Sequence, residues 1–380
     1  MSYRERKLKR ISKQLNVINH RLAKIRLLMK NITAFRIPKY VPQDIQKKMT
    51  LRRNGPDPKM SMEDVDIYSC SCCNDYTIDI NNLSYMKKIM DEYGFTVIDN
   101  VFSKDECDRL ERGVWHCMEN NTTYLRVPLK RCNPDTFKSM KKQSNDFNTY
   151  NDSMITHSDF MWKARQNVNA MKVFAELYGC NMSELITSYG GVSIQPPPEI
   201  MLGRHQGKGH HRHCSYHVEQ SPTQTEKRSF QASISTVYIH PGDYTVGFFA
   251  KSHLLLKHFG EKFNITDKAN FFQISQPEHM KFYEKRCKQI RMVNCKAGSM
   301  VVWDNRTMFS NFRPLPNRKF HNFRTACMLS YIPRSTIPTP QLYKKMEEFR
   351  ENGSSIQETE LVQQLVGFPV NLLVKNSRHI

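Results

Sequence analysis

ISTVYIHPGDYTVGFFAKSH, Ile234 to His253, holds two runs rich in β-branched and aromatic residues, with a turn sequence between them. Similar runs follow at QIRMV, SMVVWD and ACMLSYI. Such residues favour strands, and short strands joined by turns are typical of antiparallel barrels and sandwiches. A helical region, Trp162 to Tyr189, precedes them. We therefore predict an α+β fold in which an antiparallel barrel or sandwich carries helices on one side.

The size and composition of the chain fit a globular protein. Its 380 residues suit one large domain with extensions or two domains, and 39% of them are hydrophobic. No apolar run is long enough to span a bilayer, and the start, MSYRERKLKR, lacks the apolar core of a secretion signal. We therefore expect an intracellular protein, nuclear or cytoplasmic, without a transmembrane segment.

The cysteines do not form a disulfide framework. There are 11 of them, an odd number, and they are scattered along the chain. Reduced thiols are the expectation for such a protein. The close group Cys70, Cys72 and Cys73 is compatible with a metal site, although no second cysteine pair stands at zinc-finger spacing. The role of these three thiols stays open, and zinc is the metal that they would bind.

The first part of the chain is a basic arm. Residues 1–60 hold 17 Lys and Arg against 3 Asp and Glu, a net charge of +14 out of +21 for the whole chain. An apolar stripe at spacings of three and four predicts a helix over residues 1–35, followed by an extended linker over 36–84. The stripe predicts contact with the body of the chain, a neighbouring subunit or a second arm, whereas the charge favours nucleic acid or another anionic surface. The candidate partner-binding residues are Leu8, Ile11, Leu15, Ile18, Leu22 and Ile25.

The order of the motifs in the body resembles one known family. The matching pieces are GFTVIDNVFSKDECDRL, which reads as a strand followed by a helix capped by Ser103 and Glu106, then WKARQNV, HVEQSP, ISTVYIHPGDYTVGFFAKSH, KAGSMVVWDNRT and RTACMLSYIPRS. Together they resemble the phytanoyl-CoA dioxygenase-like branch of the iron(II)/2-oxoglutarate oxygenases, in the form found in large DNA viruses and algae. The resemblance implies a double-stranded β-helix, or jelly roll, with a helical flank over residues 85–352, and leaves 353–380 as a C-terminal extension.

The resemblance also implies a metal site that this chain does not complete. Such oxygenases hold iron with two His and one carboxylate. His217 and Glu219 stand two residues apart, so both point to one face of a strand. The position of the second His is Phe309, whose ring cannot ligate a metal. Arg324 matches the family's position for gripping the carboxylate of 2-oxoglutarate.

Three functions follow as alternatives. The first is a catalytically degenerate oxygenase fold with no cofactor and a binding or structural assembly role, including that of a virion component. The second is an active hydroxylase in which iron(II) and 2-oxoglutarate bind through unusual ligation. The third is a nucleic-acid-binding protein that uses the basic arm. Residues that would rescue the iron site are His210, His211, His213, Cys214 and His321. Cys214 and His217 would instead form half a zinc site, with two more ligands from Cys70, Cys72 and Cys73.

Overall fold

The computed structural model describes residues 76–142, 149–200, 216–226, 229–291, 295–315 and 322–369. The predicted helix over 1–35 lies outside the described residues, as does most of the predicted linker. The same holds for the three grouped cysteines and for all five candidate rescue residues. Their predicted roles stay predictions.

The larger of the two main sheets has seven strands in the order β1-β2-β11-β7-β13-β5-β3. Its strands pair antiparallel except for β1 and β2, which are parallel. In chain order they are β1 (Thr77–Asp79), β2 (Phe95–Asp99), β3 (Thr149–Tyr150), β5 (Val192–Gln195), β7 (Phe230–Ser235), β11 (Met300–Asp304) and β13 (Arg324–Leu329). A separate pair joins β4 (Leu185–Thr187) to β14 (Tyr331–Pro333).

The smaller sheet has five strands in the order β10-β8-β12-β6-β9, all antiparallel. They are β6 (His217–Val218), β8 (Thr245–Phe249), β9 (Phe272–Gln273), β10 (Gln289–Arg291) and β12 (Phe309–Phe312). Of the two runs that open the sequence analysis, the first overlaps the end of β7 in the larger sheet and the second contains β8 of the smaller sheet. The predicted strand through His240 ends at Ser235, because the chain then crosses from one sheet to the other.

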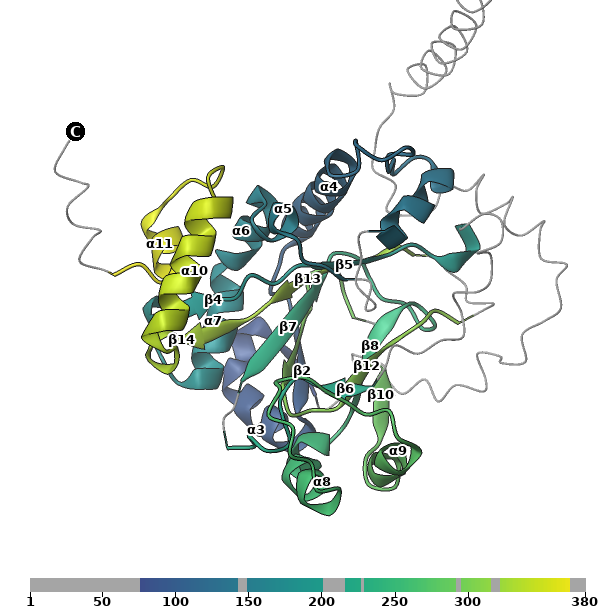
Figure 1. The fold of residues 1–380 in the computed structure, drawn as a ribbon, viewed down its shortest axis with the longest axis vertical. Helices are drawn as coiled ribbons and strands as arrows, with labels where there is room; N and C mark the ends of the chain where they lie inside the picture. Colours follow the sequence, from purple (N-terminus) through teal and green to yellow (C-terminus); the bar gives the residue numbers. More distant parts are fainter. Residues whose placement is uncertain are drawn as a thin grey trace, which may run out of the picture. The chain divides into compact units, whose positions relative to one another are not determined.

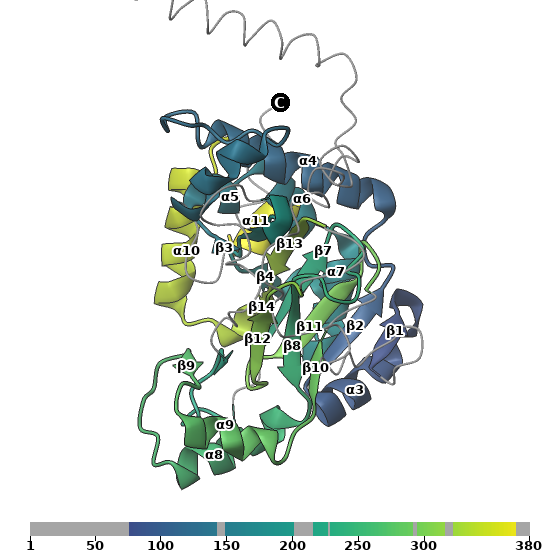
Figure 2. The ribbon, with the colours of Figure 1, turned by 90° about the vertical axis from the view of Figure 1, so that its right-hand side faces the viewer.

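Side chains alternate between two faces of the larger sheet, as strand geometry requires. On β11, Val301 and Trp303 pack with residues of the smaller sheet, while Met300 and Val302 pack in the core beneath the helices. The larger sheet is thus the middle layer, with helices on one face and the smaller sheet on the other (Figure 1). Figure 2 shows the strands of both sheets from the side, with α8 and α9 beyond them.

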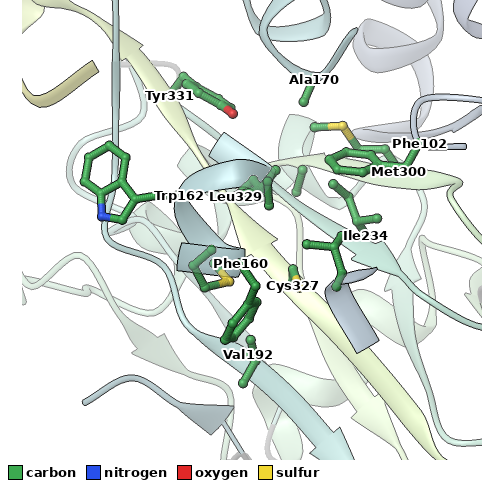
Figure 3. Packing of buried hydrophobic residues seen from close by; sticks show 14 of the residues in the cluster. Phe102, Phe160, Trp162, Ala170, Val192, Ile234, Met300, Cys327, Leu329 and Tyr331 are labelled. Carbon is green, nitrogen blue, oxygen red and sulfur yellow. The ribbon is translucent and has the colours of Figure 1, made fainter. Parts of the chain in front are cut away.

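Most of the helices form the outer wall of the main core, whereas α8 and α9 pack in a separate cluster with residues of the smaller sheet. They are α3 (Met86–Tyr93), α4 (Lys104–Asn120), α5 (Ser153–Thr156), α6 (Asp159–Arg165), α7 (Val168–Tyr178), α8 (Leu256–Lys262), α9 (Pro277–Glu284), α10 (Thr339–Asn352) and α11 (Glu360–Val366). The predicted capping box of α4 is present between Ser103 and Glu106. Figure 3 shows how Phe160 and Trp162 of α6 and Tyr331 of β14 lie near side chains from the sheet.

The α+β class with large sheets and a helical flank is confirmed, but the sheets do not close. In the part of the chain that the structure describes, the two sheets stay separate, so the arrangement is a sandwich of facing sheets and not a barrel. The core also extends beyond the predicted domain of residues 85–352. It includes β1 at one end of the larger sheet and buried residues of α11, Val362 and Leu365. Within these described ranges, no helix is long and apolar enough to cross a membrane.

Candidate functional site

A cavity of about 230 Å³ lies between the two sheets. Side chains at inward positions of both sheets form it, because alternate residues of each strand face the gap. On β7 these inward positions are Gln231 and Ser233, which are polar, while Phe230 and Ala232 face the helices. The lining residues are Thr149, His217, Glu219, Gln231, Ser233, Val246, Phe271, Trp303, Phe309, Asn311, Arg324 and Met328. The structure thus brings His217, Glu219, Phe309 and Arg324 to one place.

His217 and Glu219 come from the short strand β6 and the residue that follows it. His217 is 2% exposed and faces the cavity, while its neighbour Val218 packs on the outer side of the smaller sheet. The Nε2 atom of His217 lies 3.6 Å from Oε1 of Glu219, whose side chain is 30% exposed. The Glu219 backbone N–H donates to the Asn305 carbonyl oxygen at 2.9 Å, which ties the end of β6 to the turn after β11.

Phe309 lies directly opposite His217 in the pairing of β12 with β6. Their ring centroids are 4.3 Å apart, and Phe309 is 5% exposed. The Phe309 ring also packs on Trp303, at 5.3 Å between centroids. A third ring, that of Phe271 just before β9, has its centroid 4.9 Å from the His217 ring. Aromatic rings therefore occupy the space around His217.

Arg324 supplies a buried positive charge to the same cavity. It begins β13, pairs with Gln195 of β5 and is 4% exposed. Its Nη1 atom donates to Ser193 Oγ at 3.1 Å and to Gln195 Oε1 at 3.3 Å. The guanidinium also lies over the ring of Tyr244, with 5.5 Å to the centroid. A guanidinium held in one orientation by such contacts is suited to bind a carboxylate.

The donor set in the cavity does not fit the three-ligand iron site that the fold resemblance implies. Iron in such a site needs two imidazoles and one carboxylate. His217 and Glu219 provide one of each, and Phe309, at the position that the resemblance assigns to the second imidazole, places a carbon ring opposite His217. Across the described ranges, no three His, Cys, Asp or Glu side chains are grouped as a metal would require.

Several lining residues were not predicted as site residues. Asn311 stands two residues after Phe309 on β12, so strand parity alone places it on the same face. The polar residues Gln231 and Ser233 alternate with apolar neighbours along β7, which is the pattern of a strand facing a polar space. Phe271 gives no such signal, because it reaches His217 from a loop more than fifty residues along the chain.

No protein-family model matches the chain, and no curated protein sequence matches it significantly. Among solved structures, the chain is similar to a candidate oxidoreductase from Salmonella typhimurium LT2, with a TM-score of 0.51 and 12% identity over 77% of this chain and 86% of that one. It is also similar to GlcNAc Inducible Gene 2 (DUF1479) from Candida albicans, with a TM-score of 0.49 and 11% identity over 79% and 87%. A third similar structure is the non-heme alpha ketoglutarate dependent carbocyclase SnoK from nogalamycin biosynthesis, with a TM-score of 0.46 and 12% identity over 67% and 86%.

These similarities concern the fold and not the chemistry, because identity is near 12%. The first of them shows that the chain shares the overall architecture of the Salmonella protein. The closer resemblance to the phytanoyl-CoA dioxygenase-like branch, and to its viral form, finds no matching family model and stays a prediction. The chain thus shares a fold of facing sheets with the Salmonella protein, and a polar, partly aromatic cavity lies between its sheets.

Proposed function

We propose that the chain is a small-carboxylate-binding protein built on an oxygenase-like fold, without the iron-dependent oxygenation chemistry of that fold. One observation carries this proposal: Phe309 takes the place beside His217 in the same cavity that Arg324 enters. The cavity keeps Arg324, which would bind the carboxylate of an acid, whereas the aromatic ring of Phe309 replaces one ligand of the metal.

Binding of a carboxylate is favoured by the surroundings of Arg324. The cavity has room for a molecule of a few to about a dozen heavy atoms, and its walls near Arg324 carry hydroxyl and amide groups. A buried charge-assisted hydrogen bond contributes about 1.5–3 kcal/mol, so Arg324→Met should weaken binding of a small carboxylate by about 10- to 100-fold. Arg334→Met is the matched control, because Arg334 donates to the Phe368 carbonyl oxygen and does not line the cavity.

Substitution of Phe309 tests the second part of the proposal, that the iron site is incomplete. Phe309→His would place a second imidazole opposite His217 and beside Glu219, so this variant should bind divalent metal more tightly than the wild type. Phe309→Leu controls for loss of the ring. Calorimetric titration with Co(II) and Fe(II), combined with an assay for succinate formed from 2-oxoglutarate, measures both properties. Stoichiometric iron and succinate formation in the wild type would refute the proposal.

An active hydroxylase is the second candidate, and one observation favours it. Asn311 lines the cavity on the same strand face as Phe309, and its carboxamide oxygen is a neutral donor that iron accepts. In that case Asn311→Leu would remove both metal binding and turnover, while Phe309→His would change metal affinity little. The assembly and nucleic-acid roles expected of the basic arm remain predictions for residues 1–60.

A further inference from the structure

The end of the cavity away from Arg324 combines one carboxylate with several aromatic rings. Glu219, Phe271, Trp303 and Phe309 all line this end. The rings of Trp303 and Phe309 are in contact, and those of Phe309 and Phe271 both pack on His217. Aromatic faces carry negative potential, and rings grouped with a carboxylate attract an organic cation.

Glu219 is the acidic side chain and Arg324 the guanidinium side chain among the residues that line the cavity, and their formal charges have opposite signs. Their positions along the sheet keep them apart. Arg324 lies over Tyr244, whereas Phe309 pairs with Phe248, four residues further along the chain. At about 3.3 Å per residue, the two ends are separated by roughly 13 Å along the strand, less the inward reach of both side chains.

Resting on the carboxylate-binding function proposed above, we infer that the ligand is a small zwitterion with a carboxylate at one end and an alkylammonium group at the other. The carboxylate binds Arg324. The ammonium group lies in the cavity beside Glu219 and against the rings of Phe309, Phe271 and Trp303 that line it. Its N–H groups donate to the carboxylate of Glu219 and to the amide oxygens of Gln231 and Asn311, which line the same cavity.

The position where the fold's relatives would hold a metal cation therefore holds an organic cation in this chain. Replacement of an imidazole by Phe309 removes a metal ligand and adds a face that stabilises an ammonium group. A dicarboxylate is disfavoured by the same geometry, because its second anionic group would meet Glu219 and the negative faces of the rings.

The test compares three acids of equal chain length by calorimetric titration of the full-length protein: 5-aminopentanoate, pentanoate and glutarate. We expect 5-aminopentanoate to bind at least about tenfold more tightly than pentanoate, and glutarate to bind most weakly. Glu219→Gln and Phe309→Leu should each reduce the preference for the amino acid by about tenfold, with pentanoate binding nearly unchanged. Phe312→Leu is the matched control, because Phe312 lies on the same strand, is also buried and does not line the cavity.

The outcomes separate this inference from the function on which it rests. If pentanoate and glutarate bind and Arg324→Met abolishes their binding, while 5-aminopentanoate shows no advantage, carboxylate binding stands and the zwitterion is refuted. If none of the three acids binds the wild type, both ideas fail. A preference for 5-aminopentanoate that survives Glu219→Gln and Phe309→Leu also overturns the inference, because these residues then do not recognise the cation.

Discussion

His157 makes the stability of the helical flank sensitive to acid. This residue follows α5 and is 2% exposed, and neither of its ring nitrogens has a hydrogen-bond partner. Burial, together with the positive charges of Arg165 and Lys345, lowers the pKa of His157 from 6.5 to about 4. The His157 ring is therefore neutral at pH 7, so its 3.8 Å approach to Glu348 is not an ion pair there.

The sign and size of the effect follow from linkage. The pKa of His157 is lower in the folded state than in the unfolded state, so between pH 6.5 and about 4 the unfolded chain binds more protons. Stability is therefore full above pH 6.5 and is lost as the pH falls toward 4. The difference corresponds to about 3 kcal/mol, a large share of the 5–15 kcal/mol typical of a folded protein.

His157→Phe removes the titrating group and keeps a ring among Trp162, Tyr189 and Phe349. We expect urea unfolding at pH 7 to change by no more than about 1 kcal/mol, since the unpartnered nitrogens are lost as well. Between about pH 7 and pH 4.5, the variant should lose about 2–3 kcal/mol less stability than the wild type. The control is the same comparison for His116→Gln, which lies on the exposed surface of α4. If the unfolding free energies of the wild type and His157→Phe fell in parallel as the pH was lowered, the reasoning would be refuted.

Three further predictions concern other parts of the chain. Gly94→Ala should lower the free energy of unfolding by about 2–4 kcal/mol in a urea titration, because φ is +82° and the added Cβ would lie 2.4 Å from a threonine oxygen. Gly179→Ala should lower it by only about 1 kcal/mol in the same titration, because φ is +66° and the nearest atom is the end of a flexible lysine at 3.6 Å. Asp304→Asn should cost about 3 kcal/mol by thermal unfolding, because this fully buried carboxylate accepts two hydrogen bonds from the Arg306 guanidinium at 2.9 and 2.7 Å. Removal of residues 1–60 should abolish any salt-dependent binding to duplex DNA in a fluorescence anisotropy assay, and binding that persists unchanged would assign it to the body instead.

The sequence predicted the strands better than it predicted which sheet each one joins. The β-branched and aromatic runs contain β8 and β11 and overlap β13 and the end of β7, because their composition is a local property. The crossing after Ser235 was missed, since it depends on contacts such as the Thr236 N–H donating to the Thr325 carbonyl oxygen, 89 residues away. Long-range pairings of this kind leave no local pattern.

The residues of the candidate site also divide into those that local sequence patterns predicted and those that depend on long-range contacts. Two-residue spacing was enough to put His217 and Glu219 on one face, and strand parity would have added Asn311. The meeting of these residues with Arg324 came only from the resemblance to a family. Nothing local predicted that Trp303 and Phe271 would surround the same point, because each comes from a different part of the chain.

The ring of Phe309 changes the electrostatics of the cavity as well as its ligand set. An imidazole at this position would add a third donor beside His217 and Glu219, and a bound metal would balance the negative charge of the carboxylate. With a phenyl ring there, Glu219 and the aromatic rings line the same space, and a carboxylate and the faces of such rings both carry negative potential. Arg324 presents positive potential at the other end. A ligand with opposite charges at its two ends is stabilised at both, whereas a diacid or a diamine is stabilised at only one.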